Sequence, residues 1–491
     1  MTRKKLALLF VISFTIVNTV LFNQYIFNSS NKRESSKVEP ISKPNEIDYV
    51  NRYDKLLDCK LANYDVWQTN FDEHQSFVDR VNKNNEPYAK EAADKFKEMR
   101  IVRGILVYYP LDKGNNFELE LRWLYRSWIE AQSFEPKPGR TDLIVFVENK
   151  RSVFNNSAFF LNKLDCSFKN VRTSSLDKPM CTLIDYVAVK ERNLTKKHLD
   201  KQELSEQFTN VNDEILNYDY LLNKVNLFHN KSSDYNGYKL FYYFLKKRLS
   251  NYGYVDSILM AFDGYDYFKR AGYNFLIRSD MDVFLTPLFA KWAPKYCNDF
   301  YVGGGGYSDT FNVKRLKRVA KELDLKHAGI WNLGSTWYST PEQFRLVAYL
   351  TLFGMAYLSE EEFTPPEREG KVGTINWPYW HYGVLLLYGQ NLAMNHLIAT
   401  HQLNIVKLDK LFDVESEFSS PINQVLHIHV YHGAEMFSKF QFKDGQYDNL
   451  TTESENTNQI KFYCLKMALE SKFNDPKQLN SMLRNLTSLK N

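Results

Sequence analysis

The sequence predicts an α/β domain with a mostly parallel sheet, preceded by a helix that spans a membrane. A β-branched strand at residues 101–109, a helix with apolar positions between 119 and 129, and an apolar strand at 143–147 follow one another directly. Two strands joined by a helix pair in parallel by default. A third short apolar run, at 275–277, is followed at once by two carboxylates. The membrane helix is predicted from an apolar stretch near the amino terminus.

That stretch covers residues 6–27 and follows Arg3, Lys4 and Lys5. Its apolar part is near the lower limit for spanning a bilayer, and Tyr25 to Phe27 extend it at the interface. No small-x-small cleavage site follows, so we favour a signal anchor, and a cleaved signal peptide remains the alternative. The positive-inside rule predicts a cytoplasmic tail at 1–5, a transmembrane anchor at 6–27 and a lumenal remainder.

The lumenal part is predicted to hold a stem at residues 28–98, a globular domain at 99–440 and a carboxyl-terminal tail at 441–491. The start of the stem is rich in Asn, Ser, Lys, Glu and Pro, which is typical of disordered linkers. Five N-x-S/T sites agree weakly with a lumenal location: Asn155, Asn193, Asn230, Asn449 and Asn485.

Composition excludes some classes of function. The chain has 491 residues and a net charge of +5 from 63 basic and 58 acidic side chains, which is no nucleic-acid signature. Its five cysteines form no C-x-x-C pair, so structural zinc is not expected. Cys166 and Cys181 are close enough in sequence for a disulfide in an oxidising compartment.

Asp280 and Asp282 come shortly after the short apolar run at 275–277 and Arg278. Hard oxygen ligands at the end of a buried strand suit Mg²⁺ or Mn²⁺, and such an ion neutralises a diphosphate. The alternative for Asp-x-Asp is a solvated turn.

The rest of the chain supplies further elements. The run Gly303 to Gly306 ends a strand and predicts either close backbone approach to a ligand or a flexible loop. Residues 359–373 are expected to form an exposed loop, and 377–383 an aromatic cluster. Helices are expected at 238–249, 255–268, 313–323, 341–353, 385–397 and 459–470, and strands or extended segments at 183–187, 330–338, 405–406 and 425–432.

The order of these elements resembles the GT-A glycosyltransferases of the nucleotide-diphospho-sugar transferase superfamily, in particular Golgi type II membrane enzymes and the glycogenin-like group. The resemblance spans about residues 101–440 in order of elements rather than in dense identity. It implies a GT-A (Rossmann-like) fold in which Asp280, Asp282 and a late histidine hold Mn²⁺ or Mg²⁺ against a nucleotide sugar. Asn332 and Gly334 would face the sugar. The chain is also similar to a subgroup of animal proteins of this type, and that likeness implies no activity.

Two departures from the family pattern leave alternatives open. The late motif H-x-x-G-x-x-K-P-W is replaced by His429 and His432 before Gly433, with Lys439 but no Pro-Trp. Either histidine is a candidate metal ligand, and we favour His432 because ligands gather beyond the carboxyl ends of such strands. Where the relatives carry an Asp-Gln pair, this chain has residues 380–383, which include no acidic residue. Whether transfer would retain or invert the configuration of the sugar therefore stays open.

Each candidate residue has a proposed role and an ordinary alternative. Asp282 is the expected metal ligand, and Asp280 would contact the ribose or a metal-bound water. Arg278 would pair with a carboxylate or phosphate, and Lys439 would add charge near the diphosphate; a salt bridge and a solvated surface lysine are the alternatives.

Two aromatic sites complete the prediction. His381, with its neighbours Trp380 and Tyr382, would line the acceptor pocket, unless these rings form part of the core. Tyr108, at the end of the first strand, would stack on the base.

The predicted function is a metal-dependent glycosyltransferase in the Golgi membrane. It would move a hexose from a nucleotide sugar, UDP-sugar in preference to GDP-sugar, to a glycoprotein or glycolipid. The alternative is a GT-A-fold protein without turnover that holds a glycan or a nucleotide sugar in the lumen. The missing acidic pair favours the alternative modestly, and the intact Asp-x-Asp with late histidines favours the enzyme.

Overall fold

The computed structural model describes most of the second of two compact units, Leu57–Asn491. The described residues are 101–110, 117–135, 139–147, 160–168, 178–185, 248–249, 252–292, 299–369, 380–430, 437–450, 458–475, 477–479 and 481–482. The predicted anchor and stem, and nearly all of the helix predicted at 238–249, lie outside these ranges. Within them, no helix combines the length and the apolar character needed to cross a membrane.

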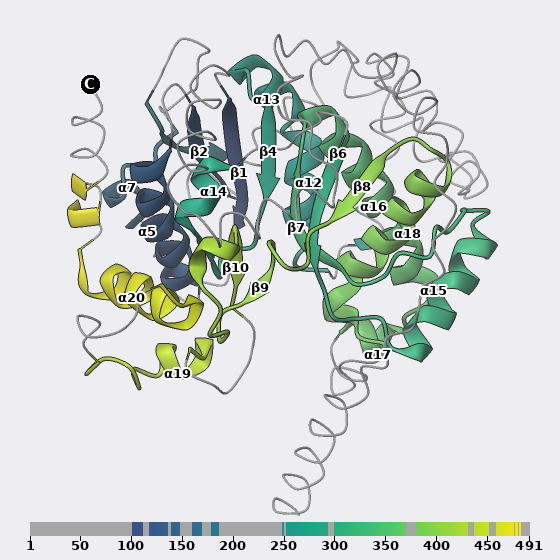
Figure 1. Ribbon diagram of the computed structural model, residues 1–491. Coiled ribbons are helices and arrows are strands. Elements are labelled where there is room, and N and C mark those ends of the chain that lie inside the picture. The colour runs from purple at the N-terminus through teal and green to yellow at the C-terminus, as the bar shows by residue number, and fades with distance from the viewer. Residues whose placement is uncertain are drawn as a thin grey trace, which may run out of the picture. The chain divides into compact units, whose positions relative to one another are not determined.

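A seven-stranded sheet forms the centre of this unit (Figure 1). Its order is β3 (Cys181–Asp185), β2 (Arg140–Val147), β1 (Val102–Tyr109), β4 (Phe275–Arg278), β7 (Leu333–Ser339), β6 (Asp299–Gly304) and β8 (Asn404–Lys407). Only β7 runs antiparallel to its neighbours among these strands. The predicted α/β class and parallel β1–β2 pair are confirmed. Because the order begins 3-2-1-4, the topological switch point lies between β1 and β4.

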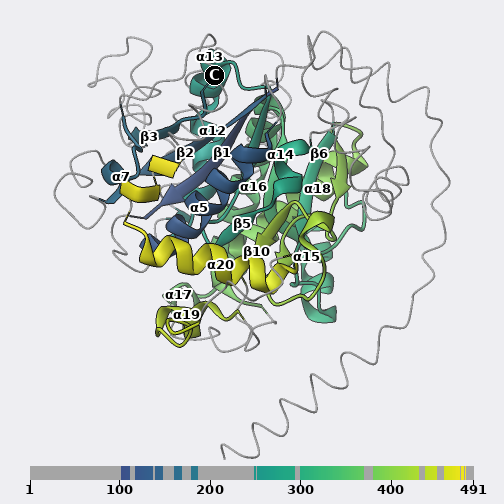
Figure 2. The same ribbon diagram turned by 60° about the vertical axis from the view of Figure 1, so that its left-hand side comes forward.

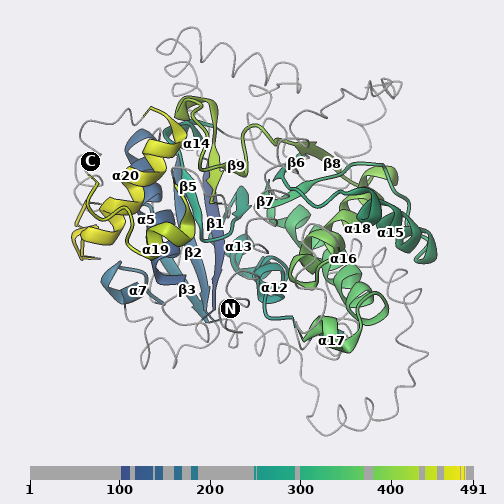
Figure 3. The ribbon, with the colours of Figure 1, turned by 90° about the horizontal axis from the view of Figure 1, so that it is seen from below.

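Helices cover both faces of the sheet (Figure 3). Side chains alternate along each strand, so Leu106 and Leu276 join one core while Ile105 and Ile277 join the other. The first core is closed by α12 (Asp256–Asp263), α13 (Tyr265–Ala271), α15 (Thr310–Glu322), α16 (Pro341–Glu361) and α18 (Leu385–Ala399). The second is closed by α5 (Glu118–Phe134), α7 (Phe160–Lys163) and α14 (Pro287–Lys291).

The predicted disulfide, Cys166–Cys181, is formed at the start of β3.

Two predicted boundaries are wrong. The helix expected at 255–268 is split at Gly264 into α12 and α13. The helix expected to end near residue 353 continues to Glu361, and α17 (Pro365–Arg368) follows it, so the described start of the expected loop at 359–373 is mostly helical. The Thr364 side chain and Glu367 form a capping box that starts α17.

A second, three-stranded sheet was not predicted. β10 (His427–His429) pairs antiparallel with β5 (Val283–Leu285) and parallel with β9 (Val414–Glu415). The chain thus leaves the large sheet at the end of β4 and enters the small sheet at β5. Residues 279–282, which include the Asp-x-Asp, form the connection.

The carboxyl-terminal segment packs against this small sheet. Helix α20 (Ile460–Phe473) lies along α5 (Figure 2). The Tyr463 hydroxyl donates a hydrogen bond to the Leu285 carbonyl oxygen at 2.7 Å, and Arg126 forms an ion pair with Glu470. The segment predicted as a tail therefore contributes a packed helix to the unit.

Candidate metal centre

Asp280 follows β4 at the carboxyl end of the strand, beside the switch point. The Arg278 guanidinium, which is buried, lies 3.4 Å from Asp280 Oδ1. It also donates to the Ser257 carbonyl oxygen at 3.1 Å and to the Ser335 carbonyl oxygen. These backbone contacts hold the guanidinium in place, so Arg278 orients one oxygen of Asp280.

Asp282 is held from its other side by a lysine. Lys439 Nζ, at the start of α19 (Lys439–Lys443), lies 2.8 Å from Asp282 Oδ2 and 2.8 Å from Glu120 Oε1. The buried Glu120 also binds Lys443 at 2.6 Å. Burial disfavours ionisation of Asp282, but His429 and Lys439 outweigh it and hold the pKa of this carboxyl well below its usual range. Asp282 is therefore an anion at neutral pH, with Lys439 beside it.

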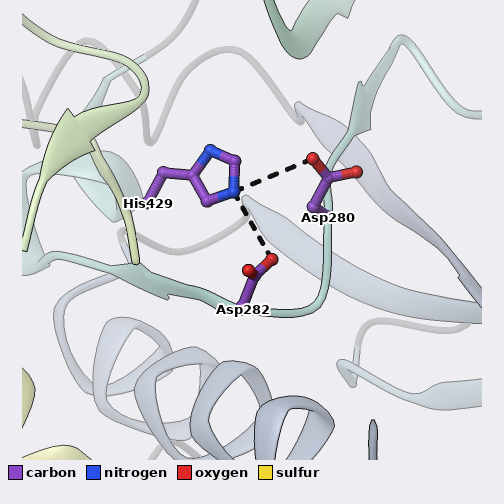
Figure 4. Close-up of side chains that lie close together, drawn as sticks. All are labelled: Asp280, Asp282 and His429. Carbon is purple, nitrogen blue, oxygen red and sulfur yellow. Dashed lines mark ion pairs between the residues drawn. The ribbon is translucent and has the colours of Figure 1, made fainter. Parts of the chain in front are cut away.

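His429 faces both aspartates (Figure 4). Its Nε2 lies 3.4 Å from Asp282 Oδ1 and 3.8 Å from Asp280 Oδ2. Strand pairing explains this meeting, because His429 is the partner of Val283 across β10 and β5. One ligand atom from each of the three side chains lies within 4.8 Å of the others. His432, the histidine that we favoured, lies outside the described residues, so its role stays a prediction.

His427 occupies the same strand face but is fully buried. Its Nε2 lies 3.0 Å from the Ser279 hydroxyl oxygen, next to Asp280 in the chain. Burial, followed by the neighbouring His429, lowers the pKa of His427 to about 3. The ring is therefore neutral and supports the connection between the two sheets.

Asp413 is a second buried carboxylate at the centre, and sequence reasoning missed it. Its Oδ1 lies 3.4 Å from His427 Nδ1 and 3.7 Å from His429 Nδ1. Burial, the largest effect, raises the pKa of Asp413 above its usual range. The glycines at 303 and 334 are the signal that could have revealed a buried neighbour, although they do not identify it.

Those glycines make room for Asp413. A Cβ built on Gly303 or on Gly334 would lie less than 3.0 Å from Asp413 Oδ2, whereas one on Gly306 would meet nothing within 4 Å. A Cβ on Gly304 would crowd Asp409 in the same loop. In this structure, the predicted close approach at the first two glycines of the run is therefore to the loop that carries Asp413.

The residues expected to face the sugar are tied to the backbone. Asn332 adopts a left-handed conformation with φ 53°, and its Oδ1 accepts a hydrogen bond from the Ser308 amide at 2.9 Å. The Gly334 carbonyl oxygen accepts one from Gln390 Nε2 at 2.7 Å. Both residues shape the segment that enters β7.

Within the described part of the aromatic cluster, residues 380–383, the Trp380 and Tyr382 rings are part of the core. Trp380 is buried and stacks on Tyr388, with ring centroids 4.2 Å apart. His381 Nδ1 accepts a hydrogen bond from the Gly383 amide at 2.9 Å and thereby caps the short helix η5 (Tyr382–Val384). It is not among the described residues that form the Asp-Asp-His cluster.

Tyr108 is half-buried near the carboxyl end of β1, where it packs against the α12 and α16 side of the core. β1 lies beside β4, and the Ser279 amide donates to the Leu106 carbonyl oxygen at 3.0 Å. The end of β1 is therefore adjacent to the Asp-x-Asp.

The fold and this cluster define an α/β protein with a candidate divalent-metal centre at the carboxyl edge of its sheet. Residues 97–491 match the family described as a domain of unknown function, DUF7164, and the chain belongs to that family. No curated protein matched the chain. Among solved structures, it is similar to mouse xyloside xylosyltransferase 1 in its apo form, with 10% identity over 64% of this chain and 87% of that chain. The TM-score is 0.28, and at that level the likeness carries no conclusion about activity.

Proposed function

We propose that this protein is a metal-dependent glycosyltransferase of GT-A type that moves a hexose from a nucleotide sugar to a glycan acceptor. The convergence of Asp280, Asp282 and His429 at the β1–β4 switch point carries the proposal. Open α/β sheets bind ligands in the crevice at this point. The order of elements, from the βαβ unit to the late histidine, resembles that of GT-A glycosyltransferases and also supports the proposal.

The side chains present fit a divalent ion. Two carboxylates and one imidazole suit Mn²⁺, and Mg²⁺ is the harder alternative. Asp282 Oδ2 is paired with Lys439, whereas Oδ1 faces His429. Asp280, Asp282 and His429 would hold the ion. When bound, the metal stabilises the negative charge that develops on the diphosphate leaving group.

The other residues would bind and orient the donor. Lys439 would add a second positive charge next to the diphosphate, because Glu120 fixes its ammonium beside Asp282. Arg278 would keep Asp280 directed at the ribose or at a metal-bound water. Tyr108 would contact the base at the end of β1, and we favour a UDP-sugar over a GDP-sugar.

We further propose that the domain acts in the Golgi lumen on glycoprotein or glycolipid acceptors, held to the membrane by residues 6–27. The disulfide between Cys166 and Cys181 supports an oxidising compartment, because such bonds persist in secretory proteins. The apolar amino-terminal stretch and the basic residues before it support the anchor and its orientation.

Calorimetry on the full chain tests the proposal. UDP and GDP are titrated with and without Mn²⁺, using wild type, Asp282→Ala and the matched control Asp409→Ala. Asp409 is an exposed aspartate whose side chain contacts Lys407 at 3.3 Å. We expect metal-dependent UDP binding in wild type and in the control, and its loss in Asp282→Ala. Binding of neither nucleotide in the presence of Mn²⁺ would overturn the proposal.

Turnover separates the enzyme from the alternative. UDP-sugars are then incubated with the wild-type chain and Mn²⁺, and released UDP is measured. Release that is lost in Asp282→Ala supports a transferase. Metal-dependent binding without release from any UDP-sugar supports instead a lumenal protein that holds nucleotide sugar or glycan.

A further inference from the structure

Helix α15 presents a row of lysines to solvent. Within Thr310–Glu322 the helix has five basic side chains and one acidic one, and its apolar face is buried in the first core. Lys314, Lys317 and Lys321 are exposed and lie three and four residues apart, which places them on one face of the helix. We call these three residues the lysine stripe; it is about 10 Å long, because a helix rises about 1.5 Å per residue.

The two arginines of α15 are neutralised by carboxylates, whereas the lysine stripe is not. Arg315 and Arg318 each lie 2.6 Å from Glu362 Oε2, and Arg318 is also 2.7 Å from Glu322. Among the residues that the structure describes, no acidic side chain forms an ion pair with a lysine of the stripe. The arginines therefore fix α15 to the end of α16, and the stripe is left as a positive surface without counter-charges.

Aromatic rings flank the lysine stripe. Phe311, in the first turn of α15, is 51% exposed. Lys317 Nζ lies 5.8 Å from the centroid of the half-buried Trp331 ring, which stacks on His327 with ring centroids 4.6 Å apart. Cations bind anionic groups, and aromatic rings bury apolar surface. The combination suits a ligand that has both negative groups and apolar ring faces.

We propose that the lysine stripe, with Phe311 and Trp331, binds an anionic polysaccharide. Short runs of Lys and Arg are typical of surfaces that bind heparin or nucleic acid, and residues 314–318 read Lys-Arg-Leu-Lys-Arg. A membrane fits less well, because a helix binds lipid by inserting its apolar face, and the apolar face of α15 is buried. Sulfate or carboxylate groups would pair with the lysines, and the sugar rings would pack against the aromatic rings.

This surface adjoins the edge of the sheet that carries the candidate metal centre. β4 and β6 both run antiparallel to β7, so their carboxyl ends share an edge. α15 begins at Thr310, soon after β6 ends at Gly304. The Arg315 guanidinium lies 4.7 Å from the centroid of the Trp380 ring, beside the predicted acceptor pocket. Binding along the stripe nevertheless needs neither the metal nor a nucleotide, so it can be tested apart from the proposed function.

The first test measures heparin binding to the full chain by calorimetry at low salt, without Mn²⁺ or nucleotide. The stripe variant combines Lys314→Gln, Lys317→Gln and Lys321→Gln. A control of equal net charge loses exposed lysines of other segments, Lys178→Gln, Lys410→Gln and Lys477→Gln. We expect the dissociation constant to rise about tenfold or more in the stripe variant, because three exposed charge pairs are lost together, and less than about twofold in the control.

Thermal unfolding confirms that both variants are folded. Equal heparin affinity of wild type and the stripe variant would overturn the proposal, and so would an equal loss in the control. Asp282→Ala should bind heparin like wild type. Failure of the chain to bind UDP with Mn²⁺ would refute the proposed function alone, whereas loss of heparin binding in Asp282→Ala would refute a surface separate from the metal centre.

The second test identifies the class of ligand. Heparin, poly-L-glutamate, poly(U) and phosphatidylserine vesicles are compared at equal concentrations of negative charge, with neutral dextran as a blank. We expect heparin to bind most tightly, and Phe311→Ala to weaken heparin by about threefold while leaving poly-L-glutamate unchanged. Tighter binding of one of the other three probes would overturn the polysaccharide and assign the surface to an acidic protein, a nucleic acid or a membrane. An equal effect of Phe311→Ala on heparin and poly-L-glutamate would refute contact between the ring and a sugar.

Discussion

The affinity of the centre for Mn²⁺ is predicted to rise steeply with pH. Burial alone would lower the pKa of His429, but the carboxylates of Asp282, Asp413 and Asp280 outweigh it and raise this pKa to about 9. At pH 7 the ring is therefore protonated, and it must lose its proton before Nε2 can bind a metal. Each pH unit below the pKa adds about 1.4 kcal/mol to the free energy of metal binding. The penalty is about 2.7 kcal/mol at pH 7 and vanishes above about pH 9.

We expect the Mn²⁺ association constant to increase about tenfold per pH unit, or about 100-fold between pH 6 and pH 8. Asp282 stays ionised throughout this range because its pKa lies well below the usual value. Calorimetry in buffers of different ionisation enthalpy should show close to one proton released per Mn²⁺ at pH 7. His429→Ala should remove most of this pH dependence. An association constant that changes less than threefold over the range, or no proton release, would refute His429 as a protonated ligand.

Three further predictions concern the surroundings of the centre. Lys439→Ala should weaken UDP binding in the presence of Mn²⁺ by about 10- to 150-fold, because one charge-assisted contact contributes about 1.5–3 kcal/mol; unchanged calorimetric affinity would contradict its role. Gly303→Ala should lower the free energy of unfolding in urea by about 1–3 kcal/mol, because the new methyl group meets Asp413, whereas Gly306→Ala should be nearly neutral. Equal midpoints for the two variants would contradict this account. Cys166→Ser opens a disulfide that joins residues 15 apart, so it should cost about 3 kcal/mol of stability, and reduced wild type should then unfold like the variant.

The large sheet was predictable because its elements have strong local patterns. Residues 101–109 are a mostly apolar, β-branched run and 143–147 a continuous apolar one, and the helix between them has clear periodicity. A strand was expected at 425–432, where β10 lies, but its pairing into a second sheet was not predictable, because its partners β5 and β9 have only three and two residues, too few to show alternation. The end of α16 was also missed, since its late polar residues resemble a loop.

The candidate site was also predictable only in part. Asp280 and Asp282 could be predicted as candidate ligands because both lie close in sequence to a buried strand. The choice of His429 depends on its register against Val283, a pairing between distant segments that no local pattern encodes. Glu120 and Asp413 look like ordinary acidic residues along the chain, and only the folded structure buries them beside Lys439 and His429.

The Asp-x-Asp lies in the connection between the two sheets, so the candidate metal centre takes its side chains from both of them. Asp280 follows β4 of the large sheet, whereas His429 lies on β10 of the small sheet, so a slide of one sheet relative to the other would change the separation of the candidate ligand atoms. Helix α20 braces the small sheet through the contact between Tyr463 and Leu285. Truncation of the chain before this helix should therefore impair the centre without removing Asp280, Asp282 or His429. An ion bound by all three side chains would link the two sheets. The force needed to slide one sheet past the other would therefore be higher with the ion bound than without it.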